Sequence, residues 1–166
     1  MTLTVPDSSL NLDRGVLAEF FINFARFEYA VMAADYSRDK SGYAEPDWSS
    51  FCASLTTDFW SAPDANLSPH LNYIRRKPPK KLVKLKNGSL KWKSRIPDTT
   101  WSEPRKILFL AQGVRNNVVH GSKFTARESP EHNRNVKLMA AATAILTTFL
   151  SHSDRVREVF NGFSPN

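Results

Sequence analysis

The chain of 166 residues has one cysteine, Cys52, and no long run of apolar residues. A single cysteine excludes a disulfide framework within the chain, and it predicts a cytoplasmic protein because disulfides mark oxidising compartments. Apolar runs of a few residues exclude a transmembrane helix, which needs about 20 residues. The first residues lack a basic region followed by an apolar stretch, so we expect neither a secretory signal nor a membrane partner.

Motifs for nucleotide, metal and nucleophile sites are also missing. Neither G-x-x-x-x-G-K-[ST] nor G-x-G-x-x-G occurs, which excludes phosphate-binding loops of those kinds. The four histidines share no spacing of four residues, and with one cysteine they form no recognisable metal site. Cys52 lies in an aromatic segment and is interpreted as a small core residue.

Acidic residues are absent from residues 65–97, which contain ten lysines and arginines. The net charge is +7, yet outside this stretch the remaining 13 basic residues are outnumbered by 16 acidic ones. The whole basic excess therefore lies in one segment of a slightly acidic chain. Such a segment is typical of a surface for an anionic partner such as nucleic acid. A solvated lysine-rich loop explains the same charge.

Helical periodicity is what the sequence does contain, and 166 residues suffice for one domain with one core. Apolar residues at spacings of three and four predict core helices over about 12–36, 47–60, 102–120 and 129–151. A further turn or two is expected over 154–160, and residues 37–46 are predicted as a loop. We therefore expect a single all-α domain over residues 1–166.

Two residues depart from the simple amphipathic pattern. Glu28 falls within the apolar stripe of the first helix, where a carboxylate needs a partner or a proton. Phe109 lies opposite the core stripe of the 102–120 helix. That helix is therefore expected to be covered on both sides, either within the domain or by another protomer.

A β-hairpin is predicted within the basic segment, as an insert over about 70–97. The dipeptide Asn87-Gly88 favours a two-residue type I′ turn. The resulting register pairs Lys84 with Lys91. Apolar side chains, with Trp92 packed beneath the hairpin, would occupy one face and lysines the other.

Lysines that face each other across a hairpin repel, which makes phosphate a favourable partner for that face. We therefore predict RNA contacts for the exposed lysines of the hairpin. These are Lys84, Lys86, Lys91 and Lys93.

A polar motif, R-N-N-V-V-H-G over residues 115–121, ends the 102–120 helix. Asn116 and His120 are four residues apart and share a helix face, toward which the long side chain of Arg115 can bend. Arginine can hold a phosphate and histidine can move a proton, which are the groups needed to cleave RNA without a metal. A helix end with a favourably placed histidine, and an arginine paired with Glu28, explains the same residues structurally.

The segment RNNVVHGSKF resembles the R-x4-6-H signature of the HEPN superfamily, in which an arginine, a polar residue and a histidine end a helix. The FFINFARFEYAV stretch, the Pro-Pro and G-x-L-x-W stretch and the long final helix resemble the Apea-like branch, over about residues 15–150. The resemblance implies a HEPN-like bundle of four to five helices with a small basic hairpin insert. It also implies a homodimer whose two motifs face each other across a cleft.

By this resemblance the chain is expected to be an endoribonuclease that uses neither metal nor cofactor, as in toxin–antitoxin, anti-phage or RNA-processing systems. Arg115, His120 and Asn116 would be catalytic. Glu28 and Asn117 would support them, although a plain structural ion pair also accounts for Glu28. The hairpin lysines would contact the RNA substrate or an antitoxin, and Lys123 would join the RNA-binding lysines.

Two other functions stay open, because some members of the superfamily lack activity or bind nucleotides. One is a non-catalytic helical adaptor that binds nucleic acid or a partner protein. The other is a partner of a nucleotidyltransferase antitoxin, for which Arg115 and His120 would form the docked or modified surface.

Overall fold

The computed structural model describes residues 13–55, 60, 62–119 and 130–162. Its long helices are α1 (Arg14–Ala33), α5 (Glu103–Val119) and α6 (Pro130–Ser151), which confirms three of the predicted core helices. The expected last turns are present as α7 (Asp154–Phe160). Within the described residues, no helix combines the length and the apolar character needed to cross a membrane.

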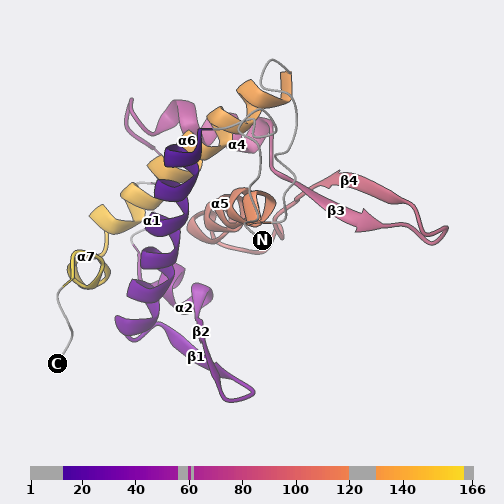
Figure 1. Ribbon diagram of the computed structural model, residues 1–166. Coiled ribbons are helices and arrows are strands. Elements are labelled where there is room, and N and C mark those ends of the chain that lie inside the picture. Colours follow the sequence, from indigo (N-terminus) through magenta and orange to yellow (C-terminus); the bar gives the residue numbers. More distant parts are fainter. Residues whose placement is uncertain (1–12, 56–59, 61, 120–129, 163–166) are drawn as a thin grey trace, which may run out of the picture.

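Helix α6 organises the body of the molecule. It packs against α1, α5 and α4 (Ser68–Arg76), and α7 turns back onto α1. Figure 1 shows α1 and α6 side by side, with two antiparallel hairpins that project from the helical body in different directions.

The core is built around Phe149 on α6. The centroid of its ring lies 6.1 Å from that of Phe27 on α1, 5.7 Å from that of Phe51, and 4.6 Å from that of Trp60. All four side chains are almost completely buried. One aromatic cluster therefore joins α1, α6 and the segment that follows α1.

Helix α1 forms where the apolar stripe predicted it. The side chain of Asp13 accepts a hydrogen bond of 3.1 Å from the backbone N–H of Val16 and caps the first turn. Phe20, Phe24 and Phe27 are buried at spacings of four and three. This stripe places Glu28, one residue further on, toward α5.

The region after α1 differs from the sequence prediction. Helix α2 (Trp48–Ala53) begins near the predicted start, with Asp47 as its N-cap, but ends well before residue 60. Residues 37–46, predicted as a loop, form the hairpin of β1 (Ser37–Lys40) and β2 (Tyr43–Pro46). The intervening Ser41 and Gly42 have φ of 53° and 84°, as a two-residue type I′ turn requires.

Helix α4 corrects the predicted start of the insert. Residues 70–76 were expected in the protruding segment, but they belong to a helix that packs on α6. Leu71 and Ile74, three residues apart, are fully buried, while the basic residues of the last turn lie outside the core. The protruding segment is thus confined to the hairpin of β3 (Lys80–Lys84) and β4 (Leu90–Ser94).

The predicted register of this hairpin is wrong by one residue. Lys84 pairs with Leu90, and Leu82 with Trp92. The turn explains this shift. The Gly88 N–H donates to the Leu85 carbonyl oxygen, and Gly88 has a φ of 83°. The strands are therefore joined by a three-residue loop with a bulge, instead of the predicted two-residue turn. A slip of one residue exchanges the faces of a strand.

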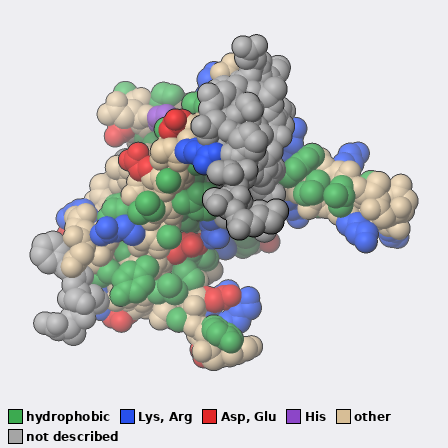
Figure 2. Space-filling model, viewed as in Figure 1, with side chains coloured by type: hydrophobic (Ala, Val, Ile, Leu, Met, Phe, Trp, Pro, Cys, Tyr) green, Lys and Arg blue, Asp and Glu red, His purple; other side chains and the backbone are tan. Residues whose placement is uncertain are grey.

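The faces of the hairpin therefore carry other residues than expected. Lys81 lies opposite Lys93, so a pair of facing lysines persists at a different place. Trp92 is not packed beneath the hairpin, because 42% of its surface is exposed, and Leu82 and Leu90 are also exposed. Figure 2 shows hydrophobic and lysine side chains together on this projection.

The second apolar side of α5 is covered from within the chain. The guanidinium of Arg95 lies 4.1 Å from the centroid of the Phe109 ring, and Trp101 meets the same ring edge-on at 5.3 Å. Phe109 therefore needs no second protomer to shield it. Arg95 directly follows β4, so this contact also fixes the base of the hairpin against α5.

Candidate functional site

The predicted ion pair between Glu28 and Arg115 is present. Arg115 Nη2 donates to Glu28 Oε1, and both side chains are about three-quarters buried, at 29% and 25% exposed. The guanidinium also lies 5.2 Å from the centroid of the Phe24 ring, within the range of a cation–π contact. Helix α1 thus holds Arg115 from two sides, and the carboxylate that broke the apolar stripe has its partner.

Burial and the arginine act on Glu28 in opposite directions. Desolvation by burial raises the pKa of this carboxyl above its ordinary 4.5, while the charge and the hydrogen bond of Arg115 lower it. Burial is the larger effect, so the pKa is raised. The pair is therefore a means of positioning Arg115 more than a gain in stability at neutral pH.

Replacing Glu28 with glutamine tests this balance. The raised pKa means that above pH 4.5 the folded chain keeps a proton that the unfolded chain has lost. We therefore expect the free energy of unfolding of the wild type, relative to Glu28→Gln, to be largest below pH 4.5 and to fall as pH rises through the raised pKa. Urea unfolding of both proteins across this range measures the difference. If the free energy of unfolding of the wild type, relative to Glu28→Gln, increased with pH, this expectation would be wrong.

Asn116 and Asn117 face a different neighbour from Arg115. Both line a cavity of about 420 Å³ between α5 and the base of the hairpin, together with Lys81, Leu82, Trp92 and Arg95. Asn117 is buried and Asn116 is half-buried. The end of α5 thus presents a held arginine on one side and two amides toward a cavity on the other.

Arg95 is the member of this site that sequence reasoning missed. Its backbone N–H donates to the Pro79 carbonyl oxygen at 2.9 Å, and its side chain crosses α5 at Gly113. A Cβ at Gly113 would lie 2.6 Å from Arg95 Cδ and 2.8 Å from Pro79 Cγ, so only glycine leaves room. A glycine inside a predicted helix was the available signal of a close approach.

Positive charge along α5 exceeds what the described carboxylates neutralise. Arg95 and Arg105 make no ion pair with any described residue, and each has a buried guanidinium nitrogen without a hydrogen-bond partner there. Burial, followed by the charges of Arg115 and Arg105, lowers the pKa of Arg95. Arg105 lies 4.4 Å from the centroid of the Trp101 ring. The positive charges of Arg95, Arg105 and Arg115 repel one another, and an anion bound near Arg95 would reduce this repulsion.

The remaining predicted site residues fall into two groups. The hairpin carries Lys84 on β3, Lys86 in the loop, and Lys91 and Lys93 on β4, all exposed and outside the lining of the cavity. His120 and Lys123 lie outside the described residues. The structure therefore brings together Glu28 with Arg115, and the two asparagines with the base of the hairpin.

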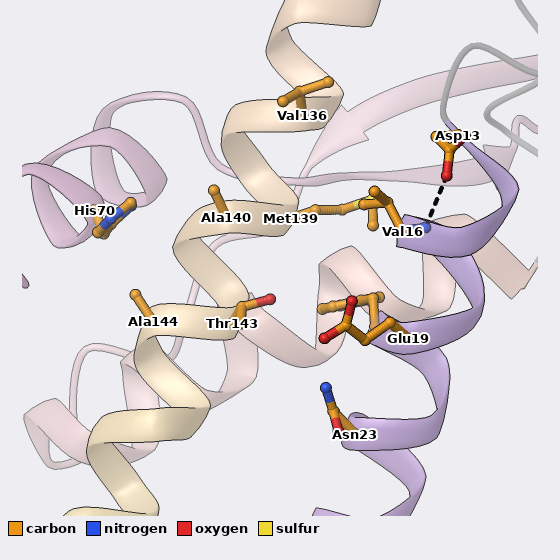
Figure 3. A pocket seen from close by; sticks show the side chains of 11 residues that line it. Asp13, Val16, Glu19, Asn23, His70, Val136, Met139, Ala140, Thr143 and Ala144 are labelled. Atoms are coloured by element: carbon orange, nitrogen blue, oxygen red, sulfur yellow. Dashed lines mark hydrogen bonds between the residues drawn. The ribbon is translucent and has the colours of Figure 1, made fainter.

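A larger cavity, of about 620 Å³, lies between α1, α4 and α6. Figure 3 shows Glu19 and Asn23 projecting from α1 toward Thr143 on α6, with Met139 near Val16. None of the predicted site residues that the structure describes lines it. It therefore contributes nothing to the predicted chemistry.

Comparison with known proteins adds no family to these observations. No family model, curated protein or solved structure matches the chain. Among the described residues, no group of three or more His, Cys, Asp or Glu side chains gathers as a metal site would require.

Proposed function

We propose that the protein is a metal-independent endoribonuclease of the HEPN type. The observation that carries this proposal is that Glu28 and Phe24 hold Arg115 near the end of α5, while another side of the same helix end lines a cavity at the base of a basic hairpin. Fixed geometry is what a phosphate-binding arginine needs, because a group already in position loses less freedom when the substrate binds. His120 follows five residues later in the same motif.

In this mechanism the 2′-oxygen of a ribose attacks the adjacent phosphorus, and the bond to the 5′-oxygen of the next nucleotide breaks. His120 takes the proton of the 2′-hydroxyl or donates one to the departing 5′-oxygen, and the His120 of a second protomer takes the complementary role. Arg115 stabilises the negative charge of the pentacoordinate phosphorane, and Asn116 orients the phosphate or the imidazole. The products are a 2′,3′-cyclic phosphate and a 5′-hydroxyl.

This mechanism uses one His120 as the acid and another as the base, so it requires the homodimer that the resemblance implies. Such an enzyme fits a toxin or an anti-phage effector, with a nucleotidyltransferase as one class of antitoxin partner. The dimer is testable by sedimentation of the purified chain, and mixing experiments with two inactive variants would show whether the site is shared.

Product chemistry tests the proposed reaction. The purified chain is incubated with mixed RNA in the presence of EDTA, and the new 3′ ends are analysed. We expect cleavage to persist in the chelator and the new ends to be 2′,3′-cyclic phosphates, because the attacking group is the 2′-hydroxyl. Ends with a free 3′-hydroxyl, or cleavage that EDTA abolishes, would refute this mechanism.

A non-catalytic adaptor for nucleic acid is the second candidate. The observation that favours it is the hairpin, which exposes Leu82, Leu90 and Trp92 beside its lysines and needs no catalytic group to bind an anionic polymer. This function predicts tight RNA binding without cleavage and no dependence on His120.

A further inference from the structure

The cavity between the hairpin and α5 combines three kinds of side chain in one place. Trp92 and Leu82 contribute apolar surface, Arg95 and Lys81 contribute positive charge, and Asn116 and Asn117 contribute amides. Its volume of about 420 Å³ lies within the range of small-molecule sites, which is about 300–1,000 Å³. An apolar wall with few convergent polar groups is the usual composition of a ligand site.

The apolar wall of the cavity consists of a cross-strand pair. Trp92 on β4 lies directly opposite Leu82 on β3, and these side chains are 42% and 47% exposed. A large aromatic surface left open beside positive charge is what a nucleobase requires, because every base has a flat face that stacks on an aromatic ring. A base within a duplex is already stacked on both faces and cannot reach such a wall.

The charged wall of the cavity depends on Arg95. Phe109 packs against its guanidinium, Gly113 leaves room for its aliphatic part, and Pro79 binds its backbone N–H. The side chain makes no ion pair with any described carboxylate, while Arg115 and Arg105 add charge of the same sign nearby. A guanidinium that is fixed in place and lacks a counter-charge matches a phosphate.

The side-chain amide of Asn116 is the third kind of group in the cavity. Asn116 is half-buried and lines the cavity, and its side chain makes no hydrogen bond with a described residue. An asparagine amide can pair with the edge of a base, which offers a donor and an acceptor side by side. Asn116 directly follows Arg115 in the chain, so the cavity and the arginine proposed to hold the scissile phosphate lie at the same end of α5, on different sides of the helix.

We infer that this cavity binds one nucleotide of single-stranded RNA, with the base against Trp92 and Leu82 and a phosphate on Arg95. The inference deepens the proposed function and rests on it for the identity of the ligand. The Asn116 amide contacts the edge of the bound base. Binding here holds the strand at the end of α5 that carries Arg115.

Binding of RNA to the His120→Ala chain in EDTA tests the base contact without cleavage. The probe is a short single-stranded RNA, measured by fluorescence anisotropy, with a blunt duplex of the same sequence in parallel. We expect Trp92→Ala to bind the single strand about 5- to 150-fold more weakly, and Trp92→Phe to retain most of the affinity. Tyr43→Ala is the matched control, because Tyr43 is an exposed aromatic residue of the other hairpin and lies outside the cavity lining.

Three further variants test the phosphate contact. Arg95→Gln should weaken binding about 10- to 150-fold, since a charged hydrogen bond is lost, whereas Arg95→Lys should lose less. Gly113→Ala should resemble Arg95→Gln, because the new methyl group would lie 2.6 Å from Arg95 Cδ and force the arginine side chain to move. Circular dichroism establishes that each variant is folded.

The outcomes separate this inference from the proposed function. If the wild type produces cyclic phosphate ends while Trp92→Ala and Arg95→Gln bind as the wild type does, the nucleotide site is wrong and the nuclease stands. If binding depends on both residues but the wild type never cleaves, the site stands and the nuclease fails. Equal affinity for the duplex, or equal competition by a polyglutamate peptide, would overturn the nucleotide site.

Discussion

The His120→Ala variant is expected to cleave RNA about 10²- to 10⁴-fold more slowly than the wild type, which is the usual contribution of general acid–base catalysis. The loss should appear in kcat, because the imidazole moves a proton in the transition state and contributes little to ground-state binding. Initial rates on a fluorogenic RNA, at saturating and at limiting substrate, measure both quantities.

The control for this experiment is His70→Ala. His70 lies on α4 and lines the other cavity, so its removal should leave kcat unchanged. If folded His120→Ala cleaves RNA at the wild-type rate, the proposed mechanism is wrong. If neither protein cleaves RNA while both bind it, the adaptor is the better description.

The Phe149→Ala variant is expected to lose about 3–5 kcal/mol of unfolding free energy, the range for a buried phenylalanine. Native proteins of ordinary stability have about 5–15 kcal/mol in total, so this loss removes a large share. The reason is specific: the ring of Phe149 contacts those of Phe27, Phe51 and Trp60, which come from elements that meet only in the core.

Urea unfolding followed by circular dichroism measures this loss. Leu90→Ala serves as the control, because Leu90 is 64% exposed and surface substitutions change stability by about 0.5 kcal/mol or less. A loss below about 1 kcal/mol for Phe149→Ala would mean that Phe149 is not the centre of the core.

The long helices were predictable because their burial is periodic. In α1, α5 and α6 the apolar spacing extends over several turns, so the pattern is strong enough to outweigh local exceptions. The regular apolar stripe of α1 also made Glu28 stand out, because a carboxylate in such a stripe needs a partner. Its partner, Arg115, lies 87 residues away, and only the motif at the end of α5 suggested the pair.

The short elements were not predictable from the same signal. Helix α4 fully buries only Leu71 and Ile74, with Tyr73 partly buried beside them, so its apolar periodicity covers little more than a single turn. The strands of the β1–β2 hairpin are mostly exposed and show no alternation of apolar and polar residues. Both elements depend on contacts with α1 or α6 that a local pattern does not contain.

The hairpin register and Arg95 were missed for physical reasons of a different kind. Asn87 accepts hydrogen bonds from the backbone N–H and the hydroxyl of Ser89, which favours the longer loop over the two-residue turn that Asn-Gly usually makes. Arg95 was one of ten basic residues in its segment. What distinguishes it is the space at Gly113, which is a property of the packed structure.

The attachment of the β3–β4 hairpin makes it a module that protein engineers could exchange. Its two ends meet at the hydrogen bond between Arg95 and Pro79, and beyond that point its strands pair mainly with each other. Hairpins of different length or side-chain pattern could replace the residues between Pro79 and Arg95 while the aromatic core stays intact. Under the proposed function, RNA preference could then be changed on this base without redesign of the helical body.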